Sequence, residues 1–178
     1  IGANAMLVRV GALYHDIGKM KNPTFFTENQ STGINPHDKL SSAESANVII
    51  NHVSIGIEIA RKNNLPDRII DFIRTHHGTS VVYYFYQKEK ALKNTINIAD
   101  FTYPGPKPFS KETAILMMCD SVEAASKSLK EPTSTKIDSF VENIINKQME
   151  NEQFLNANIT FKEIQSIKKV LKHKLANI

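Results

Sequence analysis

Histidines and aspartates occur along this chain at points where apolar residues surround them. The set that could carry chemistry consists of His15, Asp16, His52, His76, His77 and Asp120. A charged aspartate is rarely buried unless it is paired or bound to a metal ion. Both aspartates lie inside strongly apolar runs, and Asp120 has no lysine or arginine within six residues on either side. Asp120 therefore requires a cation that comes from elsewhere in the fold or is a metal ion.

The residue types in this set favour transition-metal chemistry. Imidazole and carboxylate ligands together suit Mn, Fe, Zn or Ni better than Ca. Six candidate ligands exceed what one tetrahedral ion needs, so we expect two ions about 3.5–4 Å apart with one bridging carboxylate. Adjacent helical residues point about 100° apart, so His15 and Asp16 can address both ions. Two such ions would lower the pKa of a bridging water and neutralise a phosphate, which predicts a phosphohydrolase site.

Two further residues follow the first His-Asp pair. Lys19 lies four residues after His15 and can share its helical face. We expect its ammonium group to grip a phosphate oxygen, with an ordinary surface lysine as the alternative. Gly18 is expected to let the chain leave the helix close to the site. Asp16 and Lys19 are therefore the candidate catalytic residues.

The elements that position these residues are predicted to be helices. Apolar spacing predicts helices over residues 3–17, 42–63, 66–76, 79–98, 110–129, 134–149 and 160–176. Ser41 or Ser42 with Glu44, then Ser110 and Thr160, are candidate N-caps, and Pro66 is placed to begin a helix. The stretch 53–59 alternates like a strand, but its length and flanks favour a buried helix.

Two segments between the predicted helices are long loops. Residues 21–39 are polar and contain Pro23, Gly33 and Pro36, and residues 100–110 contain three prolines between 104 and 108. Long ordered loops in compact domains are often functional, although both segments can also be plain connectors.

Composition narrows the class of protein. The 178 residues suffice for one domain with a core, and 41% hydrophobic and 22% charged residues are typical of a globular chain. One cysteine, Cys119, excludes an internal disulfide, and no apolar stretch reaches the roughly 18 residues of a membrane span. The net charge of +4 favours anionic ligands, yet no basic-aromatic motif indicates a nucleic-acid polymer as partner.

The ordered series His-Asp, His, His-His, Asp resembles the HD-domain superfamily of metal-dependent phosphohydrolases. Longer stretches, "GALYHDIGKMKNPTFFTENQ", "NPHDKLS", "THHGTSVVYYFY" and "FTYPGPKPFSKETAILMMCDSVEAA", resemble the cytoplasmic HD domain of seven-transmembrane-receptor HD proteins. These are the PgpH-type cyclic-di-AMP phosphodiesterases of bacteria. The resemblance covers roughly residues 1 to 130.

This resemblance implies an all-α fold, a single helical HD-domain bundle over residues 1–178 with a di-metal site among its central helices. It implies two ions, iron or manganese, and hydrolysis of cyclic di-AMP to linear pApA through a metal-bridging hydroxide. In the family pattern one ion is held by His15, Asp16, Asp120 and an upstream histidine. The other is held by Asp16, His52, His76 and His77. The upstream histidine would precede Ile1, which puts the occupancy of the first ion in question.

The resemblance also assigns roles to residues outside the metal set. Backbone or hydroxyl groups of Gly78, Thr79 and Ser80 are expected near phosphate. Tyr103 is expected to stack on a base and Lys107 to meet a phosphate, in a wall that also contains Pro104, Gly105 and Pro106. We expect a structural or substrate-edge role for His37-Asp38 and a surface position for His173.

The expected setting follows from the same family. The chain begins without an initiator Met inside an apolar run, as expected for a part of a larger, membrane-anchored protein. The domain itself is expected to be soluble, on the cytoplasmic face of the cell membrane, with cyclic di-AMP as its partner and a homodimer left open. Two alternatives remain: hydrolysis of another nucleotide, and nucleotide binding without turnover as a sensor. "HHGTS" lacks the GYP signature of cyclic-di-GMP-cleaving relatives, which argues against that substrate.

Overall fold

The computed structural model describes residues 1–30, 35–129 and 133–177, and confirms the prediction of an all-α fold. Within these ranges the strand-like pairing is an isolated bridge between Val81 and Thr102. The α-helices are α1 (Ala5–Tyr14), α2 (Ser42–Lys62), α3 (Asp67–Thr75), α4 (Tyr83–Lys90), α5 (Lys111–Ser126), α6 (Ser134–Glu150) and α7 (Phe161–Leu175). Short 3-10 helices are η1 (Ile17–Lys21), η2 (Pro23–Phe25), η3 (Thr27–Asn29), η4 (Pro36–Lys39) and η5 (Ile98–Phe101).

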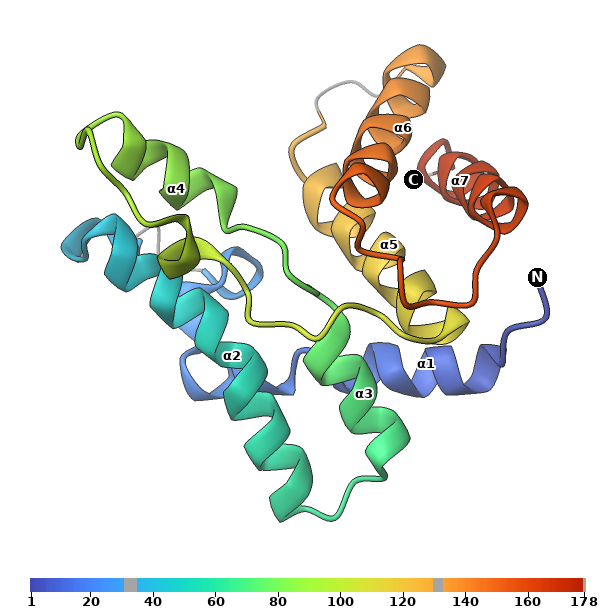
Figure 1. Ribbon diagram of the computed structural model, residues 1–178, viewed down its shortest axis with the longest axis horizontal. Helices are drawn as coiled ribbons and strands as arrows, with labels where there is room; N and C mark the ends of the chain where they lie inside the picture. Colours follow the sequence, from blue (N-terminus) through green and yellow to red (C-terminus); the bar gives the residue numbers. More distant parts are fainter. Residues whose placement is uncertain (31–34, 130–132, 178) are drawn as a thin grey trace.

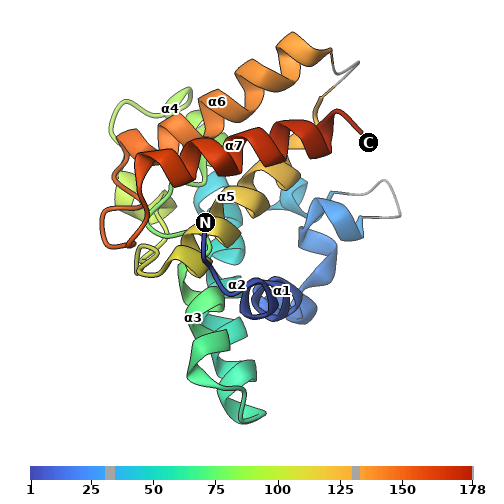
Figure 2. The ribbon, with the colours of Figure 1, turned by 90° about the vertical axis from the view of Figure 1, so that its right-hand side faces the viewer.

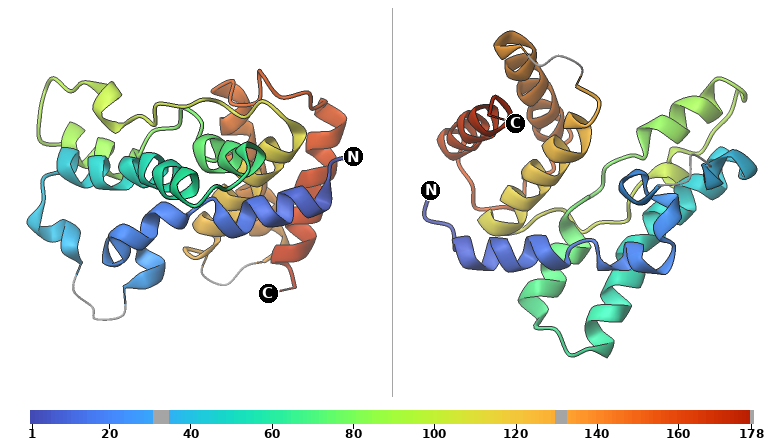
Figure 3. Two further views of the ribbon diagram at one scale, coloured as in Figure 1. Left: turned by 90° about the horizontal axis from the view of Figure 1, so that it is seen from below. Right: turned by 180° about the vertical axis from the view of Figure 1, so that it is seen from behind.

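The helices form two groups joined at their base by α1 and α3. Helices α5, α6 and α7 stand together on one side, and α2 and α4 lie on the other (Figure 1). Seen from the side, α6 and α7 run next to each other along their length (Figure 2). Helix α1 lies at the base of the α5–α7 group and packs against α3 and α5, and η1 continues from it to α2 (Figure 3).

Each group has its own core. The larger core joins the three C-terminal helices and contains Met117, Met118, Val122, Val141, Ile145, Ile164 and Ile167. A second core joins α2, α4 and η5 around Ala46, Phe85 and Phe101. Each fully buried aliphatic or aromatic side chain contributes roughly 1.5–3 kcal/mol relative to an exposed one. In the ranges that the structure describes, no helix is both long enough and apolar enough to cross a membrane.

The predicted N-caps are confirmed by hydrogen bonds. Ser41, Ser110 and Thr160 are the N-caps of α2, α5 and α7, and each accepts a bond from the backbone three residues later. The side chain of that later residue bonds back to the capping residue, which completes a capping box in all three helices. Pro66 immediately precedes α3, where its missing N–H costs nothing.

One predicted helix is much shorter than expected. The prediction over 79–98 is wrong at both ends, because helix α4 spans only Tyr83–Lys90. Before it, the backbone of residues 80–82 pairs with residues 101–103: Val82 N donates to Phe101 O and Tyr103 N to Ser80 O, at 2.7 and 2.9 Å. The strand-like alternation at 53–59, by contrast, lies within α2, as its length indicated. Of the loop 21–39, Gly33 lies outside the described residues.

Gly18 brings the His15-Asp16 turn against α2. A Cβ atom on Gly18 would lie 1.8 Å from the backbone oxygen of His52 and 2.7 Å from the backbone nitrogen of Gly56. Gly18 also lies inside η1, so its role is close packing, and the expectation that it releases the chain from the helix was wrong. This contact sets the distance between Asp16 and His52.

We predict that Gly18→Ala destabilises the protein by about 3 kcal/mol, because the added methyl group displaces backbone that cannot rotate away. Urea unfolding followed by circular dichroism measures the change. Ser54→Ala, on the exposed side of α2, is the matched control and should stay within about 0.5 kcal/mol of wild type. Equal stability of both variants would contradict the close-packing argument.

A second prediction concerns the ion pair between Glu163 and Lys111, which ties the start of α7 to the start of α5. The Lys111 ammonium and the Thr160 backbone hold the pKa of Glu163 down at about 2. The contribution of this ion pair to the stability of the folded protein is therefore complete above the ordinary carboxyl pKa of 4.5. It disappears as the pH falls through about 2.

Glu163→Gln retains the capping geometry but loses the charge. We expect it to lower the melting temperature by about 2 °C at pH 7 and to match wild type near pH 2. A difference that persists unchanged at pH 2 would show that the charge is not responsible. Thermal unfolding of both proteins across this pH range decides between these results.

Candidate metal centre

The end of helix α1 places two neighbouring side chains in the interior of the molecule. His15 is the C-cap of α1, and Asp16 follows as the N-cap of η1. Because the chain changes direction between these two elements, the two side chains point to different neighbours. Asp16 reaches towards α2 and α3, whereas His15 reaches towards α5.

The first ligand group contains Asp16, His52, His76 and His77. One ligand atom from each of the four lies within 4.8 Å of the others. Asp16 Oδ1 is 3.3 Å from His52 Nε2 and 3.5 Å from His76 Nε2. His52 comes from the middle of α2, and the His pair ends α3, so three separate elements meet here.

The second group contains His15, Asp16 and Asp120, again with ligand atoms within 4.8 Å of one another. His15 Nε2 lies 3.2 Å from Asp16 Oδ2 and 3.3 Å from Asp120 Oδ1. Asp16 is the residue common to the two groups. The structure thus brings together all six residues of the predicted metal set, with the shared carboxylate where the prediction placed the bridge.

In three of these histidines, a hydrogen bond of Nδ1 fixes the ring so that Nε2 faces the centre. Each Nδ1 contacts the backbone carbonyl three residues earlier: His15 with Ala12, His52 with Ile49 and His76 with Ile73, at 2.8, 2.5 and 2.8 Å. A carbonyl oxygen only accepts, so in the neutral ring Nδ1 carries the proton and Nε2 presents a lone pair. Such outer hydrogen bonds orient metal-binding histidines.

With the rings neutral, the atoms that converge are therefore acceptors facing acceptors. His52 Nε2 and His76 Nε2 lie 3.1 Å apart, with Asp16 Oδ1 beside both. In the part of the chain that the structure describes, His15 Nε2 and Asp16 Oδ1 are buried without a hydrogen-bond partner. Lone pairs held this close repel one another unless a cation lies between them. The donor set and its geometry fit divalent transition-metal ions.

The pKa shifts show which groups of the site are charged and which are neutral before an ion binds. Burial raises the pKa of Asp16, but its contacts with His15, His52 and His76 outweigh burial and hold the pKa well below its usual value. Burial lowers the pKa of His15, yet Asp120 and Asp16 raise it to about 10, so His15 must release a proton before its Nε2 can bind an ion. Burial lowers the pKa of both His76 and His77, which keeps these rings neutral and able to bind metal.

Lys19 lies at the edge of the centre. Its Nζ is 2.7 Å from Asp16 Oδ2 and 2.6 Å from Glu28 Oε1, and it lies 5.1 Å from the ring centroid of Phe26. Burial lowers the pKa of Lys19, but the carboxylates of Asp16 and Glu28 outweigh burial and raise the pKa above its usual value. The side chain therefore stays charged. Sequence reasoning did not find Glu28, since it carries no signal beyond its place in a polar loop.

Tyr103 packs directly on a metal-site histidine. Its ring stacks on that of His77, with centroids 4.2 Å apart and an angle of 23° between the planes. The side chain is buried, and burial together with Asp16 and Asp120 raises the pKa of its hydroxyl. One face of the ring is thus occupied by His77, while stacking of Tyr103 on a substrate base stays a prediction.

The turn after the His pair is held by a residue far along the chain. Gln153 Oε1 accepts from Thr79 N, and Gln153 Nε2 donates to Thr79 Oγ1, both at 3.0 Å. Gly78 has φ +51°, and a Cβ there would meet the same oxygen at 2.2 Å. Sequence reasoning gave no role to Gln153, which is buried between the His-pair turn and α6.

The other predicted substrate residues lie around this turn. Gly105 lies next to Thr79, because a Cβ atom added to Gly105 would be 3.3 Å from the Thr79 methyl group. Pro104 is exposed. Lys107 Nζ lies 3.8 Å from Glu152 Oε2. Their roles towards a substrate stay predictions.

Two histidines lie outside the centre. His37 is buried and donates from Nε2 to Phe25 O at 2.9 Å, a position that favours the structural role expected for it. His173 is exposed, as expected.

Comparison with known proteins places the chain in a family. The HD domain family matches residues 1–125. The cyclic-di-AMP phosphodiesterases PgpH of Listeria monocytogenes and Bacillus subtilis are 47% and 46% identical over 171 residues. These matches cover 96% of this chain but 24% of each relative, so the chain spans about a quarter of their length.

Solved structures agree with this assignment. The crystal structure of the L. monocytogenes phosphodiesterase PgpH HD domain in complex with cyclic di-AMP matches with a TM-score of 0.96 at 45% identity. The match covers 99% of this chain and 82% of that one. A second crystal structure of that HD domain matches with a TM-score of 0.93. From the family match and these relatives, we conclude that this chain belongs to the HD domain family.

Proposed function

We propose that this domain is a metal-dependent phosphodiesterase that hydrolyses cyclic di-AMP to linear pApA. The observation that carries the proposal is the convergence of lone-pair atoms in two groups that share Asp16. HD domains are metal-dependent, and this cluster has the atoms that suit divalent ions. The substrate is supported by the relatives, two of which are named for cyclic di-AMP and one of which is solved with it.

The proposal assigns two ions, iron or manganese, to the two ligand groups. Asp16, His52, His76 and His77 would hold one ion, and His15, Asp16 and Asp120 the other. When bound, two such ions activate water for attack on phosphorus and neutralise the charge of the phosphate. The second group supplies three protein ligands, a number that leaves coordination positions open to substrate.

The chain's own residues position and polarise the substrate. Asp16 sets the spacing of the two groups because its two carboxylate oxygens face different histidines. Lys19 places its ammonium group at the edge of the site, where it would grip a phosphate oxygen. Glu28 holds Lys19 there. Tyr103 covers one face of His77 and keeps water away from that ring.

The setting of the domain is also proposed. We place it on the cytoplasmic face of the cell membrane, as one domain over residues 1–178 of a longer, membrane-anchored protein, with a homodimer left open. The length of the relatives, of which the chain matches 24%, supports a longer protein, and the membrane setting rests on the resemblance to seven-transmembrane-receptor HD proteins.

We predict that the protein with Mn²⁺ converts cyclic di-AMP to pApA in preference to cyclic di-GMP. Asp16→Ala should lower the rate at least about 1,000-fold, because several kcal/mol of charge stabilisation is lost with the shared ligand. Chromatography of the products measures both rates. Hydrolysis retained in this variant would overturn the two-metal mechanism.

The number of Mn²⁺ ions bound per chain gives a second test of the same mechanism. At saturating Mn²⁺ we expect wild type to bind two ions per chain, with the ion of His15, Asp16 and Asp120 bound more weakly because its upstream histidine ligand is not part of this chain. Asp120→Asn, which disturbs only the second group, should bind one ion, and Asp16→Ala should hold none tightly. If wild type binds metal but leaves both dinucleotides intact, the substrate is another nucleotide. If it binds cyclic di-AMP without turnover, the domain is a sensor.

A separate prediction concerns Lys19→Met, which should lower kcat for cyclic di-AMP about 100-fold while the Mn²⁺ count stays at the wild-type value. The reason is that the ammonium group acts on the phosphate rather than on the ions. Lys21→Met removes a nearby exposed charge and should leave kcat unchanged. A loss of metal together with kcat would instead make Lys19 a support for Asp16.

A further inference from the structure

Two glutamines at the end of α6 bond to two chain segments that carry ligands of different groups. Gln148 lies in the last turn of α6, and Gln153 lies in the turn that follows this helix. Both side chains are buried, at 9% and 2% exposed. Gln153 N donates to Gln148 O at 2.9 Å, which joins the two residues through the backbone. Both lie outside residues 1–125, the part of the chain that matches the HD domain family.

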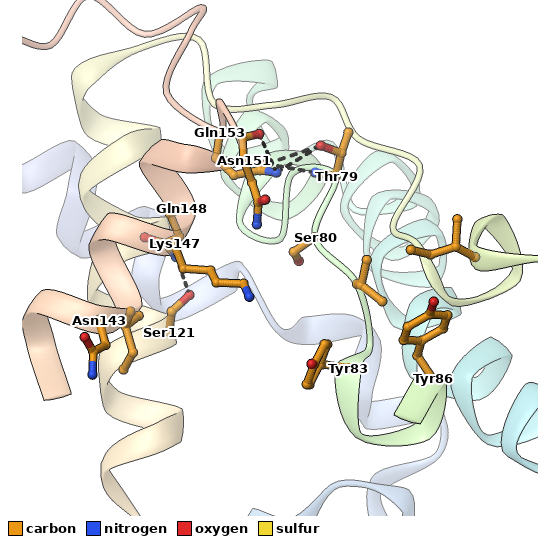
Figure 4. Close-up of a pocket in the computed structure, with 13 residues that line it drawn as sticks. Thr79, Ser80, Tyr83, Tyr86, Ser121, Asn143, Lys147, Gln148, Asn151 and Gln153 are labelled. Carbon is orange, nitrogen blue, oxygen red and sulfur yellow. Dashed lines mark hydrogen bonds between the residues drawn. The ribbon is translucent and has the colours of Figure 1, made fainter. Parts of the chain in front are cut away.

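Gln153 holds the turn that follows the His pair. Its Oε1 accepts from Thr79 N and its Nε2 donates to Thr79 Oγ1, so both ends of the amide are used (Figure 4). Within the turn, Ser80 N donates to His77 O at 3.0 Å, a bond that closes the turn without placing it against other elements. Because Thr79 follows closely after His77, the contact with Gln153 sets the position of this ligand relative to the end of α6.

Gln148 holds the part of α5 that carries Asp120. Its Nε2 donates to Ser121 Oγ at 2.8 Å and to Met117 O at 3.5 Å (Figure 4). Ser121 directly follows Asp120, and Met117 lies one helical turn before Ser121, so the amide contacts the helix on both sides of this ligand. Gln148 therefore sets the position of Asp120 relative to the same end of α6.

The metal centre depends on the relative position of these two segments. His77 belongs to the first ligand group and Asp120 to the second. Hydrogen bonds are directional, so they fix a distance that apolar contacts between helices leave free to slide. A metal site needs its ligands held within about 0.5 Å of the productive geometry. Two amides joined by a backbone bond supply such a constraint from one place in the fold.

We propose that Gln148 and Gln153 are positioning residues of the metal centre, which hold Asp120 and His77 at the separation that two ions require. The inference rests on the metal site of the proposed function and gives the region after α5 a role in it. The two glutamines also line one pocket together with Thr79, so direct contact with a bound ligand is the competing role.

Calorimetry with Mn²⁺ on metal-free protein, without substrate, tests the proposal. Gln153→Met removes both bonds to Thr79 and should weaken the ion of the first ligand group about tenfold, as loss of a group that orients ligands does. Gln148→Met should weaken the ion of the second group by a similar factor. Asp120→Asn, which retains only the first ion, identifies the binding step that belongs to each group.

A double-mutant cycle tests the bond between Gln148 and Ser121. Ser121→Ala removes the partner of the amide and should weaken the ion of the second group as much as Gln148→Met does. The double variant should be no weaker than either single variant, because each change removes the same bond. Effects that multiply in the double variant would contradict positioning through this bond.

Two controls separate positioning from a general loss of stability. Val141→Ala removes buried methyl groups from the core face of α6, and Gln165→Met changes an exposed glutamine of α7. Val141→Ala should lower the melting temperature at least as much as the glutamine variants do, because it leaves a cavity. Both controls should bind both ions as wild type does. Glutamine variants that melt earlier but keep both Mn²⁺ affinities would show a structural role and overturn the proposal.

Activity on cyclic di-AMP separates this inference from the proposed function. If wild type leaves cyclic di-AMP intact while the glutamine variants lose Mn²⁺ affinity, the proposed function fails and the inference stands. If wild type hydrolyses cyclic di-AMP and the variants bind both ions as tightly, the inference fails alone. A higher KM at unchanged Mn²⁺ affinity would make the glutamines substrate contacts and would also overturn the inference.

Discussion

Around Asp16, histidine nitrogens and carboxylate oxygens are brought so close that only positive charge can keep them there. His52 and His76 face each other with their unprotonated nitrogens 3.1 Å apart, and Asp16 Oδ1 lies beside both. No arrangement of hydrogen bonds among these acceptors satisfies them all. The rest of the structure can be understood as the scaffold that holds this arrangement in place.

The scaffold acts mainly through the backbone. The carbonyls of three helical turns hold the outer nitrogens of His15, His52 and His76, so each ring is oriented by its own helix. Gly18 then allows the turn that carries Asp16 to touch α2 at His52. Ring orientation is thus a local property, whereas the distance between the ligands depends on how tightly two elements pack.

The short segment from His76 to Ser80 connects the metal centre to the rest of the molecule. Its first two residues belong to the first ligand group, and its last two line a pocket of about 750 Å³ between this segment, α4, α5 and α6 (Figure 4). Tyr103 packs on one side of it and Gln153 holds the other. Gln153 comes from the segment after α6, so its hydrogen bonds with Thr79 tie that segment to the turn that follows the His pair.

The sequence by itself determined the candidate ligands, the all-α fold and the capped starts of α2, α5 and α7. Aspartates inside apolar runs require a cation, and capping residues act within one turn of their own helix, so local residue types were sufficient. The shortened helix at 79–98, the packing role of Gly18, and the contacts of Glu28 and Gln153 were decided only by the tertiary structure. Each depends on a contact with a distant segment, such as the pairing of residues 80–82 with 101–103, and such contacts leave no periodic signal in the chain.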